Sequence, residues 1–206
     1  MDYVTIRGEA QGRYEEKHSV FLASVKGISS FEEGLAFAKA VSKKYSDATH
    51  NCYAILTRTG EQKFSDDGEP QGTAGTPILQ SIKRNDLTDV VCVVTRYFGG
   101  IKLGASGLVS AYAKAAAEGF LSSEKILRKE CAFYRIAASY ADHSALSSLI
   151  AKNGGKLTDT RYDEGICVDC AVPLGQKETF ENGVREAFGG KRLPKLLGTG
   201  YETYLL

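Results

Sequence analysis

Apolar residues recur along the chain with two spacings, every second residue in some stretches and every third or fourth in others, which predicts strands alternating with helices. Residues 3–28 alternate and predict two strands around a Gly-rich turn. Residues 87–98 are apolar on both faces, so we expect a central strand there. The other predicted elements of this half are a helix over 29–45, a strand over 52–59 and helices over 72–85 and 105–123.

Residue types that favour helix starts mark where three of the helices begin. Ser29 or Ser30 is placed to cap the first helix. Thr76 is a plausible cap for the second helix, with Pro77 as its first residue. Asp142 is placed in the same way before a helix of the second half.

A charged stretch, residues 122–130, separates the two halves of the chain. We place the domain boundary near Arg128, with one domain over 1–128 and another over 129–206. The second half predicts the order strand, helix, strand, strand, helix, strand, which is typical of the ferredoxin-like sandwich. The sequence therefore predicts an α+β protein of two domains.

Composition narrows the class of protein. The 206 residues are 43% apolar, which is enough for a packed core. The formal net charge is +1, so binding to phosphate would depend on local placement of charge and not on a basic surface. The first residues do not resemble a signal peptide, and no stretch has the length of apolar residues that a membrane span needs. We expect a cytoplasmic protein without a membrane partner.

Five cysteines are an odd number for a disulfide framework. Cys52, Cys92 and Cys131 lie in apolar runs and are expected to be buried thiols. Cys167 and Cys170 have the spacing of a redox or zinc pair, but residues three apart on a strand point to opposite faces. We therefore expect these two to be structural.

The segment Thr95–Gly107, TRYFGGIKLGASG, places four glycines, one arginine and one lysine between a predicted strand and a predicted helix. Glycines let the backbone approach a ligand, and a helix N-terminus offers unpaired N–H groups and partial positive charge. One interpretation is a phosphate or nucleic-acid site, and the other is a turn that only packs the helix on the sheet, with Phe98 in the core. The candidate contacts are Arg96, Tyr97, Gly99, Gly100, Lys102, Gly104, Ser106 and, further along the helix, Lys114.

A second polar cluster comprises His50, Asn51, Asp66, Asp67 and Glu69. The three carboxylates precede a Gly-rich helix start. They could serve a metal or act as acids, or they could form a solvated Asp-Gly turn. No Walker, dinucleotide-binding or nucleophile-elbow motif occurs, so we name no catalytic residue, metal or cofactor.

DDGEPQGTAGTPIL and VVTRYFGGIKLGASGLVSAY together resemble the IMPACT/YigZ family, and the resemblance extends over essentially the whole chain. Relatives often carry a further glycine where this chain has Ala105-Ser106-Gly107. The resemblance implies an N-terminal domain folded like the second domain of a ribosomal small-subunit protein and like domain IV of elongation factor G. It also implies a ferredoxin-like C-terminal domain. Eukaryotic relatives, which lack that second domain, are implied to regulate translation by binding an activator of the amino-acid-starvation kinase.

Three functions follow from these observations. The first is a non-enzymatic protein that binds RNA or the ribosome through the Gly-rich segment, with Tyr134, Arg135 and Tyr140 as further contacts on the second domain. The second is an enzyme acting on a small phosphorylated ligand, with Asp66, Asp67 and Glu69 handling a metal or a proton. The third is a protein–protein adaptor in translation control.

Overall fold

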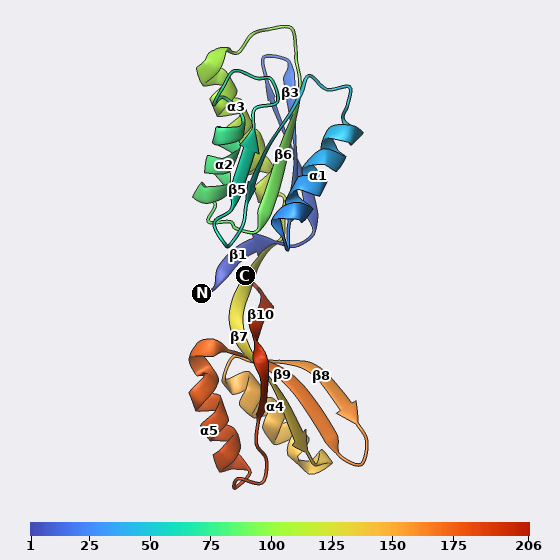
Figure 1. Ribbon diagram of the computed structural model, residues 1–206, viewed down its shortest axis with the longest axis vertical. Helices are drawn as coiled ribbons and strands as arrows, with labels where there is room; N and C mark the ends of the chain where they lie inside the picture. The colour runs from blue at the N-terminus through green and yellow to red at the C-terminus, as the bar shows by residue number, and fades with distance from the viewer. The chain divides into compact units, whose positions relative to one another are not determined.

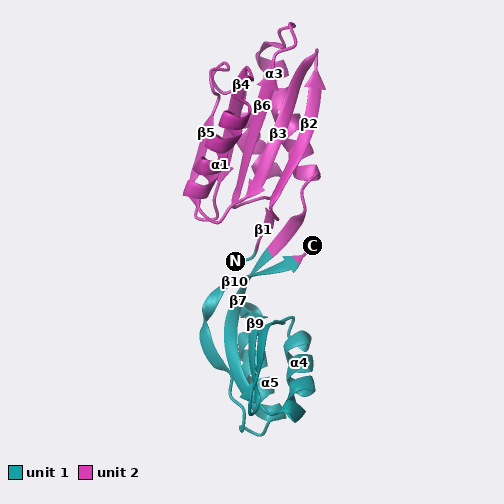
Figure 2. Ribbon diagram, turned by 90° about the vertical axis from the view of Figure 1, so that its right-hand side faces the viewer, with its two compact units in different colours: residues 1–2, 128–204 teal, residues 3–127, 205–206 magenta.

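The computed structural model describes all 206 residues, which divide into two compact units (Figures 1 and 2). The N-terminal domain comprises residues 3–127 with 205–206, and the C-terminal domain comprises residues 128–204 with 1–2. Both domains combine helices and strands, which confirms the α+β class. No helix has the length and apolar character that crossing a membrane would require.

The N-terminal domain is built on an antiparallel sheet of order β2-β3-β6-β4-β5, with helices on both faces (Figures 1 and 2). β6 is the middle strand and is buried along nearly its whole length, as its apolar faces predicted. The strands are β2 (Glu9–Glu16), β3 (Ser19–Gly27), β4 (His50–Leu56), β5 (Gln62–Ser65) and β6 (Val90–Tyr97). The helices are α1 (Phe31–Lys44), α2 (Gly75–Arg84) and α3 (Gly104–Leu121).

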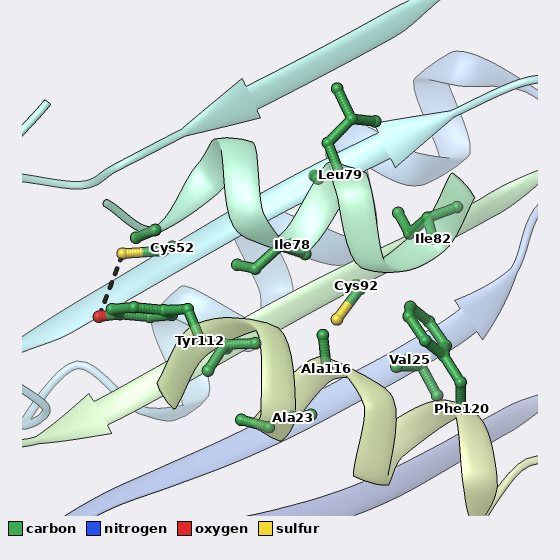
Figure 3. Close-up of a cluster of buried hydrophobic side chains, with 14 of the residues drawn as sticks. Ala23, Val25, Cys52, Ile78, Leu79, Ile82, Cys92, Tyr112, Ala116 and Phe120 are labelled. Carbon is green, nitrogen blue, oxygen red and sulfur yellow. Dashed lines mark hydrogen bonds between the residues drawn. The ribbon is translucent and has the colours of Figure 1, made fainter. Parts of the chain in front are cut away.

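Two apolar layers fill the space between this sheet and its helices. One layer lies under α2 and α3, and Figure 3 shows Ile78, Cys92 and Phe120 within it. The other lies under α1 and includes Val91 and Val93 of β6. α3 packs very closely on β2, because glycines lie on both sides of the contact: a Cβ on Gly12 would come within 2.3 Å of Gly119 N.

The C-terminal domain has the ferredoxin-like order expected from the sequence. β7 lies between β9 and β10, and β8 pairs with β9, while α4 and α5 supply apolar residues to its core. Its elements are β7 (Lys125–Ala138), α4 (His143–Lys152), β8 (Lys156–Tyr162), β9 (Ile166–Pro173), α5 (Lys177–Ala187), β10 (Lys195–Leu205) and short 3-10 helices at Tyr140–Asp142 and Leu174–Gln176. β1 (Tyr3–Ile6) belongs to the N-terminal domain.

Several local expectations differ from the structure. Residues 3–28 form three strands where two were predicted, because the chain breaks at Gly8, whose φ is +65°. The charged stretch before residue 131 is already strand, since β7 begins at Lys125. Asp142 sits before α4, but its carboxylate accepts hydrogen bonds from the backbone N–H and hydroxyl of Ser139 and makes no cap bond to α4.

Candidate functional site

Arg96 and Glu69 bring the two polar segments of the sequence together. Arg96 lies near the end of β6, and its Nη1 donates a hydrogen bond to Glu69 Oε1 at 2.6 Å. The exposed fractions of the two side chains are 7% and 4%. The guanidinium also lies over the rings of Phe21 and Phe98, with its carbon 5.5 and 5.4 Å from their centroids. The Gly-rich segment and the acidic cluster therefore form one site.

Tyr112 also holds Glu69 in place and is itself contacted by the buried Cys52. Tyr112 of α3 donates its hydroxyl to Glu69 Oε1 at 2.8 Å, and Cys52 Sγ lies 3.4 Å from the same hydroxyl (Figure 3). Burial, together with Cys52 and Glu69, raises the pKa of Tyr112, so the hydroxyl stays protonated and remains a donor. Sequence reasoning did not find Tyr112, whose signal is the one tyrosine within an alanine-rich helix.

His50 faces Glu69 from the start of β4. Its Nδ1 lies 2.7 Å from the carbonyl oxygen of Asp67, and a carbonyl oxygen only accepts, so Nδ1 carries a proton. Its Nε2 lies 3.9 Å from Glu69 Oε2. His50 thus has one nitrogen fixed by the backbone and the other next to the buried carboxylate.

The other two carboxylates of the cluster hold the backbone. Asp66 accepts hydrogen bonds from the N–H groups of Gly72, Ala74 and Gly75, at 2.8, 3.0 and 2.8 Å. Burial alone would raise the pKa of Asp66, but these three bonds lower it below its ordinary value. Asp67 Oδ2 accepts from the N–H of Asn51 at 2.6 Å. Nowhere in the chain do three or more His, Cys, Asp or Glu side chains gather as a metal site would need.

The cap of α2 is therefore Asp66, and the expectation for Thr76 was wrong. α2 begins at Gly75, with Ala74 at the N-cap position and no hydrogen bond from a side chain at that position. Asp66 lies nine residues before Gly75 and reaches the free N–H groups from outside the helix. A side chain so distant in sequence satisfies the same donors that a local Thr would.

The Gly-rich loop after β6 is open to solvent. Phe98, expected in the core, is 47% exposed, because its ring lies over the Arg96 guanidinium at the rim of the site. Tyr97 donates its hydroxyl to Asp47 at 3.1 Å. Gly99 lies against the backbone of His18, where a Cβ would come within 2.0 Å. Gly100 has a φ of +84°, which favours glycine.

α3 begins in this loop without a side-chain cap. Leu103 stands at the N-cap position, Gly104 has a φ of +74°, and Ser106 falls in the exposed first turn. The first backbone N–H groups of α3 are thus not bonded by a cap side chain. They border a hollow of about 410 Å³. Its polar wall is formed by Thr49, His50, Glu69, Arg96, Lys102 and Gly104, and its apolar wall by Pro70, Phe98, Leu103, Ala105 and Leu108.

Lys114 and the second-domain candidates lie apart from the hollow. Lys114 is three turns along α3, about 15 Å from its start by helix rise, and donates to the Tyr14 hydroxyl at 3.1 Å. Tyr134, expected as an RNA contact, is fully buried in the C-terminal core with its hydroxyl bonded to Glu181, because it faces the helices. Arg135 is bonded to Asp169, and Tyr140 is exposed.

The cysteines are placed as the sequence predicted. Cys52, Cys92 and Cys131 are buried. Cys167 is half-buried while Cys170 is buried, as opposite faces of β9 require.

Comparison with known proteins gives two matching family models. Residues 17–120 match the Impact N-terminal domain, and residues 136–191 match a domain of unknown function (DUF1949). A solved structure described as the crystal structure of an hypothetical protein covers 96% of this chain and 98% of its own, with 25% identity and a TM-score of 0.62.

Curated relatives include bacterial and eukaryotic proteins. The IMPACT family member YvyE of Bacillus subtilis is 32% identical over 191 residues, 92% of this chain and 88% of the relative. The IMPACT family member YigZ of Escherichia coli is 29% identical over 170 residues, 81% of this chain and 83% of the relative. Protein IMPACT of Xenopus laevis is 34% identical over 105 residues, which is 48% of this chain and 32% of that protein.

Proposed function

Since the chain belongs to the IMPACT family, we propose that it is a non-enzymatic protein that binds RNA or the ribosome and takes part in the regulation of translation. The observation that carries the proposal is the start of α3, which has no side-chain cap and borders a hollow beside Lys102. Unpaired N–H groups, the helix dipole and a lysine together favour a phosphate group. A partner in translation would place the protein in the cytoplasm.

The residues of the Gly-rich segment have different roles in this proposal. Lys102 is exposed and is the direct cationic contact, together with the N–H groups of the first turn of α3. Arg96 is buried against Glu69, so it positions the loop and the carboxylate and is not the main phosphate contact. Phe98 is exposed at the rim of the hollow and offers a ring face for stacking on a base.

The three carboxylates of the polar cluster are already hydrogen-bonded within the protein, which makes a metal-dependent enzyme the weaker alternative. Asp66 and Asp67 are bonded to backbone N–H groups, and Glu69 to Arg96 and Tyr112. A metal ion held by this cluster would have to displace those bonds. An adaptor role has no comparable feature of the site to support it.

The test is binding to purified ribosomes and to structured RNA at low and moderate salt. We compare the wild type with Lys102→Ala and with Lys39→Ala, an exposed lysine on α1, which covers the opposite face of the sheet (Figure 1). Loss of one phosphate contact should weaken binding and lower the slope of log affinity against log salt by about 0.7–0.9. Lys39→Ala should bind like the wild type. Absence of binding by the wild type at every salt concentration would overturn the proposal.

A further inference from the structure

The hollow has its positive charge at one point and is not lined by a row of cations, as a groove for a nucleic-acid backbone would be. Of the two cations in its wall, Arg96 is paired with Glu69, which leaves Lys102 as the exposed one. Proteins that follow a nucleic-acid backbone neutralise several phosphates with several Lys or Arg side chains. This site is instead suited to a single phosphate group.

His50 gives the hollow a second kind of polar contact. Since Nδ1 is bonded to the carbonyl of Asp67, Nε2 is the ring nitrogen left to contact a ligand at the wall of the hollow. A phosphate monoester carries a charge between −1 and −2 near neutral pH, with a second pKa of about 6, and has three terminal oxygens for charge-assisted hydrogen bonds. An internal phosphodiester has a single charge and two such oxygens, so it has less to gain from this set of donors.

Arg96 adds an independent sign that the hollow is built for a ligand. It lines the hollow and is only 6% exposed, yet its Nε has no hydrogen-bond partner. A buried donor without a partner is costly, and such groups are rare in folded proteins. The buried guanidinium also offsets the charge of Glu69, which would otherwise repel an anion.

We propose that the hollow at the start of α3 binds a terminal phosphate, a phosphate monoester at the end of an RNA chain or on a free nucleotide. This rests on the proposed function, because it specifies which phosphate the same site recognises. Lys102 and the first N–H groups of α3 contact the phosphate oxygens, and His50 in its imidazolium form donates a further hydrogen bond from Nε2. Phe98, Leu103 and Leu108 form the apolar wall against which the attached nucleoside lies.

The experiment measures the affinity of the full chain for a short single-stranded oligoribonucleotide with a 5′-phosphate, with a 3′-phosphate, or with hydroxyls at both ends. A nucleoside monophosphate and the matching nucleoside form a second pair of probes. The variants are Lys102→Gln and His50→Gln, with Lys39→Gln as the matched control and thermal unfolding to confirm the fold. We expect a terminal phosphate to tighten binding at least tenfold, and each site variant to remove most of that gain.

The outcomes separate this inference from the proposed function. Equal binding of the phosphorylated and hydroxyl-ended oligonucleotides would overturn the terminal-phosphate site and leave RNA binding in place. Binding of the nucleoside monophosphate alone, lost in Lys102→Gln, would support the terminal-phosphate site and count against RNA as the ligand. Binding to neither kind of probe would overturn both. A terminal-phosphate gain that survives in both site variants would place the phosphate elsewhere and overturn the inference.

Discussion

Arg96 donates a hydrogen bond to Glu69 at 2.6 Å, and both side chains are more than nine-tenths buried. The bond joins Glu69, in the connection between β5 and α2, to the end of the central strand β6. Tyr112 adds a third element, α3, to the same carboxylate. The shape of the hollow thus depends on one buried ion pair that three parts of the chain share.

The variant Glu69→Gln should be strongly destabilised. It leaves the Arg96 charge buried without its counter-charge, and removal of one partner from a buried pair costs about 3–5 kcal/mol. Chemical denaturation gives the change in the free energy of unfolding. Glu118→Gln, at an exposed site on α3, is the control and should stay within about 0.5 kcal/mol of the wild type. A Glu69→Gln variant as stable as the control would show that the pair contributes little.

Asp66→Asn should weaken the start of α2 by about 1–2 kcal/mol, as the loss of a charged cap does. The folded pKa of Asp66 is depressed, so the carboxylate contributes stability above the ordinary aspartate pKa of about 4. That contribution is lost as the pH falls through the lower folded value. The stability difference between wild type and variant should therefore be full at neutral pH and shrink in acid. A difference independent of pH would contradict the assignment. Hydrogen exchange at Ala74 and Gly75 locates the effect.

Gly12→Ala should force α3 away from β2. The added Cβ would lie 2.3 Å from Gly119 N, a backbone atom that cannot rotate aside. Overpacking of this kind costs about 1–3 kcal/mol or more. Gly175→Ala is the matched control, since a Cβ there meets nothing within 4 Å. Thermal unfolding distinguishes the two, and equal melting temperatures would mean that α3 and β2 pack less closely than described.

Cys167 should be the first thiol of the native protein to react with an alkylating reagent. It is half-buried, whereas the other four cysteines are buried. Burial raises the pKa of Cys170 to about 12 and also raises the pKa values of Cys52, Cys92 and Cys131, so these remain thiols. Mass spectrometry of the labelled native protein tests this. The Cys167→Ser variant should show no early labelling, and rapid labelling of Cys92 would indicate an open core.

Sequence patterns predicted the features of the fold that depend on local periodicity. β6 was expected in the centre because its residues are apolar on both faces, and the ferredoxin-like order followed from the order of its elements. The start of β7 was missed because the charges around Arg128 look like those of a linker. The alternation of buried and exposed residues in β7 becomes visible only when buried Ile126 is counted as part of the strand.

The site was predicted in pieces but not as a whole. Both polar segments were identified, yet the pairing of Glu69 with Arg96 depends on the strand register that sets His50 opposite Arg96. Such a register is a property of the folded sheet and cannot be predicted from the local spacing of residues in the sequence. The same reason explains why Asp66 was missed as the cap of α2. It bonds the N–H of Gly75 from nine residues earlier in the chain, whereas local spacing pointed to Thr76.

The two apolar layers of the N-terminal domain have a consequence for where a label can be attached. Neighbouring residues of β6 belong to different layers: Val91 and Val93 pack under α1, while Cys92 and Val94 pack under α2 and α3. The wall of the hollow takes no residue from α1. The exposed surface of α1 thus contributes nothing to the hollow, which makes it the natural place to attach a reporter or a fusion partner.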